Sequence, residues 1–213
     1  MDNRSNNLKE GLIKFLTIAG DLMALNLLWF VCSLPIITIG PSTCALFNVT
    51  LKLADDQSFP VLKTFFKAFK ENFKQSLAVG AFSIVVIVAL YFDVNFVLAS
   101  EGTIQTVYII VSAILYTMLL STISYLNALI CRYNNTLKGH IINTLKLAFV
   151  NPIRTILMWA ILSLPVLIIL FIQPIIILYL GWFFILFLVS LPVYMCSTIL
   201  VKIFRKFENA EGK

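Results

Sequence analysis

Four long stretches without a charged residue constrain what this chain can fold into. They are residues 22–51, 75–92, 102–131 and 155–201. A helix needs about 20 apolar residues to cross the hydrocarbon core of a bilayer. A soluble helical protein could bury one stretch of this kind in its core, but not four. We therefore expect an all-α, polytopic transmembrane helical bundle that forms a single integral membrane domain over residues 1–213.

The overall composition agrees with this expectation. Hydrophobic residues make up 60% of the 213 residues and charged residues only 12%, about half the charged fraction of a typical soluble domain. The N-terminus is basic and then apolar, as in a signal peptide. However, the apolar run continues past Trp29 to Pro35 without a cleavage site of small residues. We therefore expect this segment to be retained as the first membrane span.

The positions of the positive charges predict the topology. All 16 lysines and arginines fall into four clusters beside the apolar stretches. The clusters are Arg4, Lys9 and Lys14; Lys52, Lys63, Lys67, Lys70 and Lys74; Arg132, Lys138, Lys146 and Arg154; and Lys202, Arg205, Lys206 and Lys213. The segment 93–103 and the Gln173–Pro174 turn contain no positive charge. By the positive-inside rule, the clusters and both termini are cytoplasmic and these two turns face outward.

This topology requires residues 15–51 to enter the membrane and return. Their middle, Ser33 to Pro41, contains two prolines and a glycine and predicts a helix break. We expect about six membrane segments, namely five full spans plus a short return helix. The full spans are 15–34, 76–97, 104–130, 153–172 and 174–200, and the return helix covers about 41–53. The alternative is an outside N-terminus with five spans, which misplaces only the three charges of the first cluster.

Two cytoplasmic segments have the pattern of interfacial amphipathic helices. Residues 60–76 place apolar side chains on one face and lysines beside them, as in a helix in the headgroup region of a bilayer with anionic lipids. The expected membrane-surface residues are Phe65, Phe66, Phe69, Phe73, Lys63, Lys67, Lys70 and Lys74. Residues 136–150 show a weaker version. Superposing Phe65 on Leu145 and Lys74 on Arg154 indicates duplicated units of span, interfacial helix and span.

No pattern of catalytic residues is present, and we expect a protein that is not an enzyme and that uses no cofactor. The phosphate-binding and dinucleotide-binding glycine motifs do not occur. The only histidine, His140, lies in a cytoplasmic segment and is expected to be a solvated residue. The four cysteines have no metal-ligand spacing and are expected to pack as small apolar residues. The chain has a net charge of +6, and its lysines and arginines flank the apolar spans. This arrangement favours anionic lipid over nucleic acid as a partner.

The candidate functional residues lie in the first span and in the break that follows it. They are Asp21, Asn26, Pro35, Thr38, Gly40 and Pro41. A carboxylate in a membrane span is a functional candidate because its burial is costly, but Asp21 could also lie shallow enough to meet water or pair with a lysine. A broken helix can expose carbonyl groups and helix ends to a ligand, or it can be a plain turn between two antiparallel helices. Both alternatives remain open from the sequence.

A set of short motifs resembles the YesL-like family of bacterial integral membrane proteins, a domain of unknown function. The motifs are Asn26–Trp29, Ser33–Pro35, Thr38–Pro41, Phe65–Phe66 and Phe69–Lys74. Genes of this family commonly lie beside carbohydrate ABC importers and polysaccharide-degrading enzymes. The resemblance therefore implies a role in sugar uptake at the plasma membrane of Gram-positive-type bacteria. It supplies no reaction, no substrate and no active site.

Two functions are consistent with these observations. The first is a non-enzymatic accessory protein that associates with carbohydrate ABC transporter subunits. The alternative is an independent small-solute transporter or channel, which the break and Asp21 favour. A water-filled cavity that reaches Asp21 or Asn26 would support the alternative, whereas a tightly packed bundle would support the accessory function.

Overall fold

The computed structural model describes residues 2–99, 101–171 and 186–211, and every element within these ranges is helical. The elements are α1 (Asp2–Ser33), the 3-10 turn η1 (Ile36–Thr38), α2 (Ile39–Ala54), α3 (Val61–Glu71), α4 (Phe73–Ala99), α5 (Gly102–Arg132), α6 (Leu137–Val150), α7 (Pro152–Phe171) and α9 (Ser190–Glu211). This confirms the predicted all-α class. The predicted turn at Gln173–Pro174 and the first part of the predicted span 174–200 lie outside the described residues.

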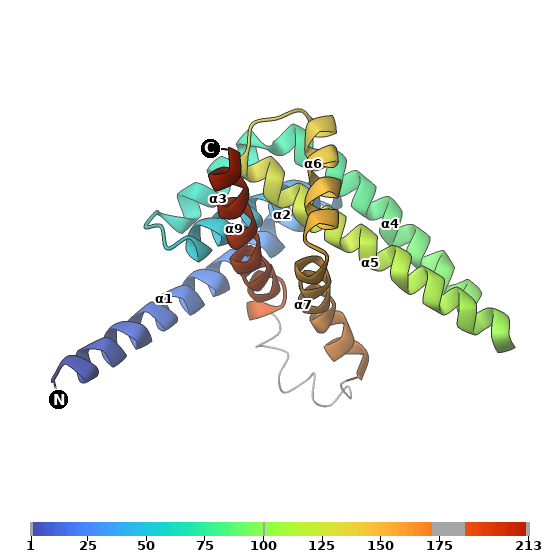
Figure 1. Cartoon of the computed structure of the whole chain (residues 1–213), viewed down its shortest axis with the longest axis horizontal. Coiled ribbons are helices and arrows are strands. Elements are labelled where there is room, and N and C mark those ends of the chain that lie inside the picture. Colours follow the sequence, from blue (N-terminus) through green and yellow to red (C-terminus); the bar gives the residue numbers. More distant parts are fainter. Residues whose placement is uncertain (1, 100, 172–185, 212–213) are drawn as a thin grey trace.

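Helix α2 lies at the centre of the structure, where it contacts α1, α3, α4, α5 and α9 (Figure 1). Ten of its 16 residues are buried, and many of them are small or polar. They are Gly40, Pro41, Ser42, Cys44, Ala45, Leu46, Phe47, Val49, Thr50 and Leu51. Short side chains allow helix backbones to approach closely, as is common where helices pack inside membranes. The segment predicted to be a short return helix is therefore the core element of the fold.

Several helices are long and apolar enough to cross a membrane. Among the described residues, three meet this condition on length and composition: Lys9–Ser33, Ile36–Ala54 and Phe73–Val97. A fourth span is possible if Leu137–Val150 and Pro152–Leu164 are taken together, although these two helices meet at a bend of 104°. The protein therefore has the helices of a polytopic membrane protein, while the number of six segments stays a prediction.

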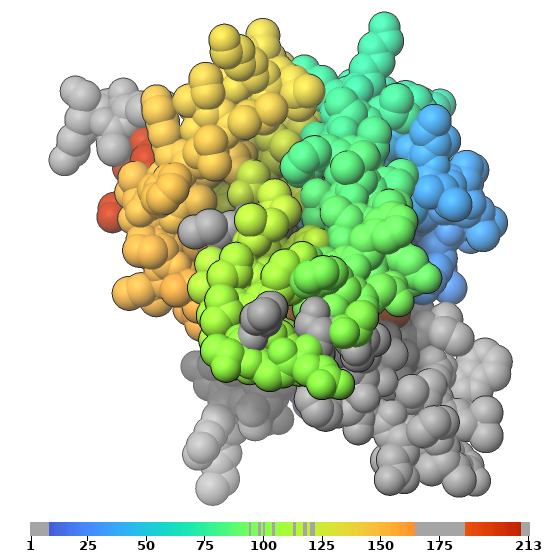
Figure 2. Space-filling view, turned by 90° about the vertical axis from the view of Figure 1, so that its right-hand side faces the viewer, coloured from blue at the N-terminus to red at the C-terminus, as the bar shows by residue number. Residues whose placement is uncertain are grey.

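Helices α4 and α5 form an antiparallel pair that projects away from the central helices, on the side opposite the N-terminus of α1 (Figure 1). Figure 2 shows the two helices side by side in front of the rest of the molecule. Their outward surface is apolar and includes Val85, Ile87, Phe92, Ile110 and Ile114, each about half exposed or more. Near the far end, the Tyr108 hydroxyl donates to Asp93 Oδ1 at 2.6 Å. An apolar exterior of this size is expected where lipid or another membrane protein is the neighbour.

The predicted break after the first span is present. Helix α1 ends at Ser33 and α2 begins at Ile39. The Thr38 hydroxyl lies 2.6 Å from both the Cys32 and the Pro35 carbonyl oxygens, so it can donate to either of these groups at the end of α1. The Trp29 indole N–H donates to Thr43 Oγ1 at 3.1 Å and joins the two helices above the turn. Hydrogen bonds from Thr38 and Trp29 therefore stabilise the turn between α1 and α2.

Two helix junctions elsewhere in the chain share one arrangement. At the α3–α4 junction, the Asn72 side chain donates to the Ala68 carbonyl at 3.1 Å, and the Ser76 hydroxyl donates to the Asn72 carbonyl at 2.6 Å. At the α6–α7 junction, Asn151 donates to the Leu147 carbonyl at 3.3 Å. There the Thr155 hydroxyl donates to the Asn151 carbonyl at 3.0 Å. In both cases an asparagine ends a short helix and a hydroxyl one turn later starts a long one.

These matching bonds correct the register of the internal repeat. Asn72 and Asn151 make equivalent bonds at the two junctions, so they occupy equivalent positions in the repeat. Superposing Lys74 on Arg154 instead gives an alignment that is shifted by one residue. The corrected register also pairs Phe65 with Thr144, and both side chains are fully buried. Leu145, the residue first matched to Phe65, is 45% exposed. The duplication itself stays a prediction, and these hydrogen bonds support it in the new register.

Candidate functional site

The two polar candidates of the first span have different surroundings. Asp21 is partly exposed on the surface of α1. Asn26 is completely buried, and its side-chain oxygen accepts hydrogen bonds from the backbone N–H groups of Val189, at 3.1 Å, and Ser190, at 3.0 Å. Helix α9 begins at Ser190, so Asn26 satisfies N–H groups that a helix start leaves without an intrahelical partner. In this structure Asn26 acts as a cap supplied by a distant helix.

The glycine of the break lies at a close helix crossing. A Cβ atom added to Gly40 would lie 2.1 Å from the Ser76 carbonyl oxygen and 2.8 Å from the Gly80 Cα atom. Because both neighbours are backbone atoms of α4, α2 and α4 would have to separate to accommodate a side chain. Pro41 is buried beside this crossing, while Pro35 is exposed in the turn. Among the predicted break residues, Gly40 therefore has a clear packing role.

The predicted membrane-surface helix is α3 together with the start of α4. Leu62 and Phe66 are 56% and 45% exposed, and Phe69 and Phe73 are half-buried. Phe65 is completely buried in the core of the protein, as is Ala68. The expectation that Phe65 inserts into lipid is therefore wrong, because α2 covers that side of α3. The remaining exposed side chains, with the exposed lysines beside them, keep the character expected of a surface helix.

Ion pairs join α1, α2, α5 and α9 at one end of the bundle. Arg205 of α9 donates to Asp55 at the end of α2, with a distance of 3.1 Å from Nε to Oδ1. Arg132 at the end of α5 makes a bidentate contact with Glu208 of α9, with its Nη2 atom 3.0 and 3.2 Å from the carboxylate oxygens. Lys14 of α1 lies 2.7 Å from Asp56. Members of the first, third and fourth positive clusters therefore meet at the same end of the molecule.

Two of these groups have shifted pKa values. The hydrogen bond from Arg205 holds the pKa of the Asp55 carboxyl below its usual value of 3.8. Burial, and then the hydrogen bond that its hydroxyl donates to Glu208 at 2.6 Å, raises the pKa of Tyr133 to about 12. The Tyr133 ring also packs edge-on against Phe204 of α9. At neutral pH the Asp55 carboxylate is therefore ionised and Tyr133 is neutral, as their hydrogen bonds require.

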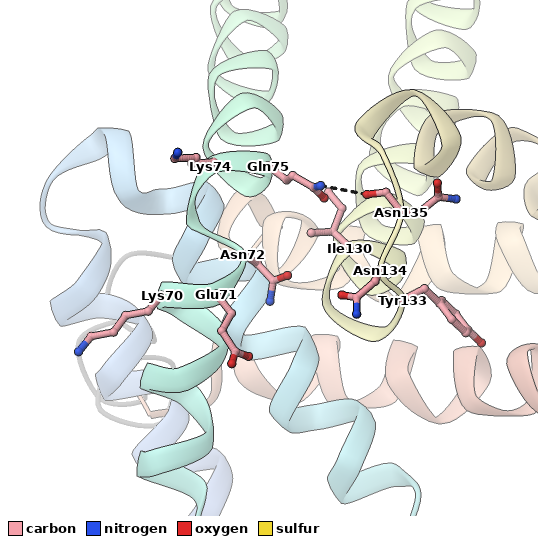
Figure 3. Close-up of a pocket in the computed structure, with 9 residues that line it drawn as sticks. All are labelled: Lys70, Glu71, Asn72, Lys74, Gln75, Ile130, Tyr133, Asn134 and Asn135. Carbon is pink, nitrogen blue, oxygen red and sulfur yellow. Dashed lines mark hydrogen bonds between the residues drawn. The ribbon is translucent and has the colours of Figure 1, made fainter.

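A polar cavity of about 560 Å³ opens between the α3–α4 junction and the loop that follows α5 (Figure 3). Four side-chain amides line it: Asn72, Gln75, Asn134 and Asn135. The remaining lining residues are Lys70, Glu71, Lys74, Ile130 and Tyr133. Its volume is within the usual range of small-molecule sites. These amides were not among the residues predicted from the sequence, although the polar run from Tyr133 to Thr136 between apolar stretches marks a loop there.

The cavity is held in shape by hydrogen bonds across its wall. The Gln75 amide donates to the Asn135 backbone carbonyl at 3.0 Å, which connects the start of α4 to the loop (Figure 3). The Asn135 side-chain oxygen accepts from the Thr136 N–H at 2.7 Å. A second cavity of about 160 Å³ is lined by Asn48, Leu51, Lys52, Gln57, Cys131 and Arg132. Neither of these two cavities is lined by Asp21 or Asn26.

The structure shows how far His140 and the cysteines are buried. His140 lies in α6 and is only 1% exposed, so the expectation that it is solvated is wrong. Burial of the Thr144 and Leu147 side chains on the same helix shows that this face of α6 packs inward. Cys44 and Cys196 are buried, as expected for cysteines that pack like small apolar residues. Within the described residues, no group of histidine, cysteine and carboxylate side chains could hold a metal ion.

The fold and its apolar helices define a helical integral membrane protein with a polar cavity at the end where its charged residues meet. A family model described as "Protein of unknown function, DUF624" matches residues 22–94, from the middle of α1 through most of α4. This segment contains the motifs that carry the resemblance described above, while membership of the YesL-like family itself stays a prediction. The chain matches no curated protein and no solved structure.

Proposed function

We propose that this chain is a non-enzymatic accessory membrane protein associated with a carbohydrate ABC-type importer of the bacterial plasma membrane. Its termini and the polar cavity are cytoplasmic in this proposal. The link to carbohydrate uptake comes from the family resemblance. The accessory role is supported by what the polar groups of the first hairpin do in the structure.

The observation that carries the accessory role is the use of Asn26. A solute path through the first span would need polar groups that are free to contact the solute. The Asn26 oxygen is instead committed to the start of α9, and the Thr38 hydroxyl is committed to the end of α1. Deeper in the bundle, the Thr50 and Ser197 hydroxyls pair with each other at 2.8 Å between α2 and α9. These contacts hold helices together and support a packed scaffold.

The structure also presents a surface on which a partner can dock. Helix α3 exposes Leu62 and Phe66 beside Lys63 and Lys67 at the charged end of the molecule. A mixed apolar and basic surface suits a partner that lies partly in the headgroup region. We assign this surface to contact with the importer.

Gentle purification from native membranes tests the proposal. The tagged chain, extracted in a mild detergent after crosslinking, is expected to bring down subunits of a carbohydrate importer. Phe66→Ser is expected to reduce their recovery several-fold. Ile141→Ser, which changes an equally exposed apolar residue on α6, serves as the matched control and should leave recovery unchanged. Recovery of no transporter subunit with the unmodified chain would rule out the accessory role.

The alternative function, an independent transporter or channel, makes a different prediction. Purified protein in liposomes would then move a solute, and Asp21→Asn would slow that movement. The accessory proposal predicts no flux across a panel of sugars and ions. Flux that depends on Asp21 would replace it with the transporter function.

A further inference from the structure

The polar cavity of Figure 3 offers both donors and acceptors of hydrogen bonds. Asn72 uses one amide N–H for the Ala68 carbonyl, which leaves its oxygen and second N–H available. The Gln75 oxygen is available for the same reason. The Asn135 side-chain amide lies against Gly139 of α6 and points away from Asn72 in Figure 3. Asn134 is exposed, and no hydrogen bond of its side-chain amide is found among the described residues. The Asn72, Gln75 and Asn134 amides can therefore each donate and accept hydrogen bonds in the cavity.

The charged side chains are arranged differently from the amides. In Figure 3 the Asn72 and Asn134 amides point toward each other across the cavity, whereas the ammonium groups of Lys70 on α3 and Lys74 on α4 extend away from it. The Glu71 carboxylate is also part of the lining, and Ile130 adds an apolar side chain between the amides. The cavity is therefore lined by amides, one apolar side chain and the Glu71 carboxylate, while the lysine ammonium groups are directed away from the amides.

From this arrangement we propose that the cavity binds a ligand with vicinal hydroxyl groups, that is, a polyol. A hydroxyl is itself both a donor and an acceptor, and an amide can bond two adjacent hydroxyls at once through its oxygen and nitrogen. Ile130 can contact the C–H groups of the same ligand. A phosphate is anionic at neutral pH, so the amide oxygens and the Glu71 carboxylate would disfavour it, and cations would have to point inward to bind it.

The polyol can come from two sources. The cavity lies where α4 leaves the charged end and its apolar stretch begins at residue 75. A lipid headgroup with two hydroxyls, such as phosphatidylglycerol, could enter from the bilayer and place its phosphate near Lys70 or Lys74. A free neutral polyol could enter from water. The shared chemistry is the pair of adjacent hydroxyls.

Binding measurements on the purified full chain test this proposal. The probes are myo-inositol by calorimetry, and phosphatidylglycerol and phosphatidic acid by native mass spectrometry. Phosphatidic acid is the control because it is anionic but has no diol. We expect saturable binding of myo-inositol, or stronger binding of phosphatidylglycerol than of phosphatidic acid. Absence of saturable myo-inositol binding, together with equal binding of the two lipids, would overturn the proposal.

Variants locate the site. Asn134→Ala is expected to weaken binding by about three- to tenfold, the effect of one lost hydrogen bond. Asn143→Ala removes an exposed amide on α6 outside the cavity and should not change binding. Within the part of the chain that the structure describes, the Asn134 amide makes no hydrogen bond, and a thermal unfolding curve verifies that the variant is intact. Equal effects of the two variants would place the ligand elsewhere and overturn the proposal.

A second pair of variants separates the two sources. If the ligand is a lipid headgroup, Lys70→Gln with Lys74→Gln should weaken phosphatidylglycerol binding, whereas Lys63→Gln with Lys67→Gln should have little effect. If the ligand is a free polyol, myo-inositol binding should survive both pairs. The inference does not depend on the importer association, because the purified chain binds the probe without a partner. Failed co-purification and failed polyol binding are thus separate results.

Discussion

The side-chain oxygen of Asn26 lies 3.0 Å from the backbone nitrogen of Ser190 and caps the start of α9 from the middle of α1. This bond is buried and links the first and last described helices. It explains why a polar residue is placed within the first apolar span. The same residue was a candidate for solute binding on sequence grounds, and the structure shows it in a structural role.

Replacing Asn26 with alanine should therefore destabilise the protein. The substitution leaves the N–H groups of Val189 and Ser190 without this acceptor inside the protein, which costs about 2 kcal/mol. Thermal unfolding in detergent measures the effect. Asn95→Ala is a suitable control. Asn95 is exposed on α4, and its side-chain amide donates to the Tyr91 carbonyl of the same helix. Equal losses of stability for the two variants would contradict the capping role.

Alanine substitutions at Gly40 and Gly20 should change the stability of the protein in opposite directions. Gly40→Ala places a methyl group against the backbone of α4 and should destabilise the protein by roughly 1 to 3 kcal/mol. Gly20→Ala lies in α1 with nothing within 4 Å, so it should stabilise the helix by up to about 1 kcal/mol. Unfolding curves for both variants check the prediction. A neutral Gly40→Ala would show that α2 and α4 do not cross as closely as described.

The ion pair between Asp55 and Arg205 predicts a dependence of stability on acid. Because the folded pKa of Asp55 lies below the usual 3.8, its stabilising effect is complete above that pH and is lost as the pH falls through the folded pKa. Asp55→Asn should therefore lower stability at neutral pH and lose its effect in stronger acid. Asp56→Asn is the control, since Asp56 and Lys14 are both more than 60% exposed and such pairs contribute little. A loss that is independent of pH would contradict the assignment.

Tyr133 predicts an effect at alkaline pH. Its folded pKa of about 12 lies above the usual 10, so its contribution to stability is complete below pH 10 and is lost as the pH rises toward 12. The difference in ultraviolet absorbance between the unmodified chain and Tyr133→Phe should show one tyrosine ionising near pH 12. A difference step centred near pH 10 would show that the hydroxyl does not bond Glu208 in a buried setting.

Comparison of the sequence with the structure shows which features local patterns can predict. The break after Ser33 was predictable because proline and glycine act on the backbone where they stand. The helix at α3 was predictable from its spacing of apolar residues. The burial of Phe65 against α2 was not predictable from this spacing. The pattern shows which side chains share a face, but it does not show whether lipid or α2 covers that face.

The remaining features depend on contacts between distant segments. The pairing of Asn26 with Ser190 and the approach of Gly40 to Gly80 require the helices to be placed first. The polar cavity is likewise built from a helix junction and a loop that are far apart in the chain. For the candidate site, the sequence analysis could identify polar residues but could not bring them together.

In the proposed topology, the break turns the first hairpin back so that all positive clusters are cytoplasmic. Labelling with a membrane-impermeant maleimide in intact cells tests it most directly, with single cysteines introduced as Lys9→Cys, Ser58→Cys and Thr103→Cys in a background without the native cysteines. We expect only Thr103→Cys to react in intact cells, and the other two to react in inverted vesicles. Reaction of Lys9→Cys in intact cells, with Ser58→Cys protected, would show an outside N-terminus and contradict the topology.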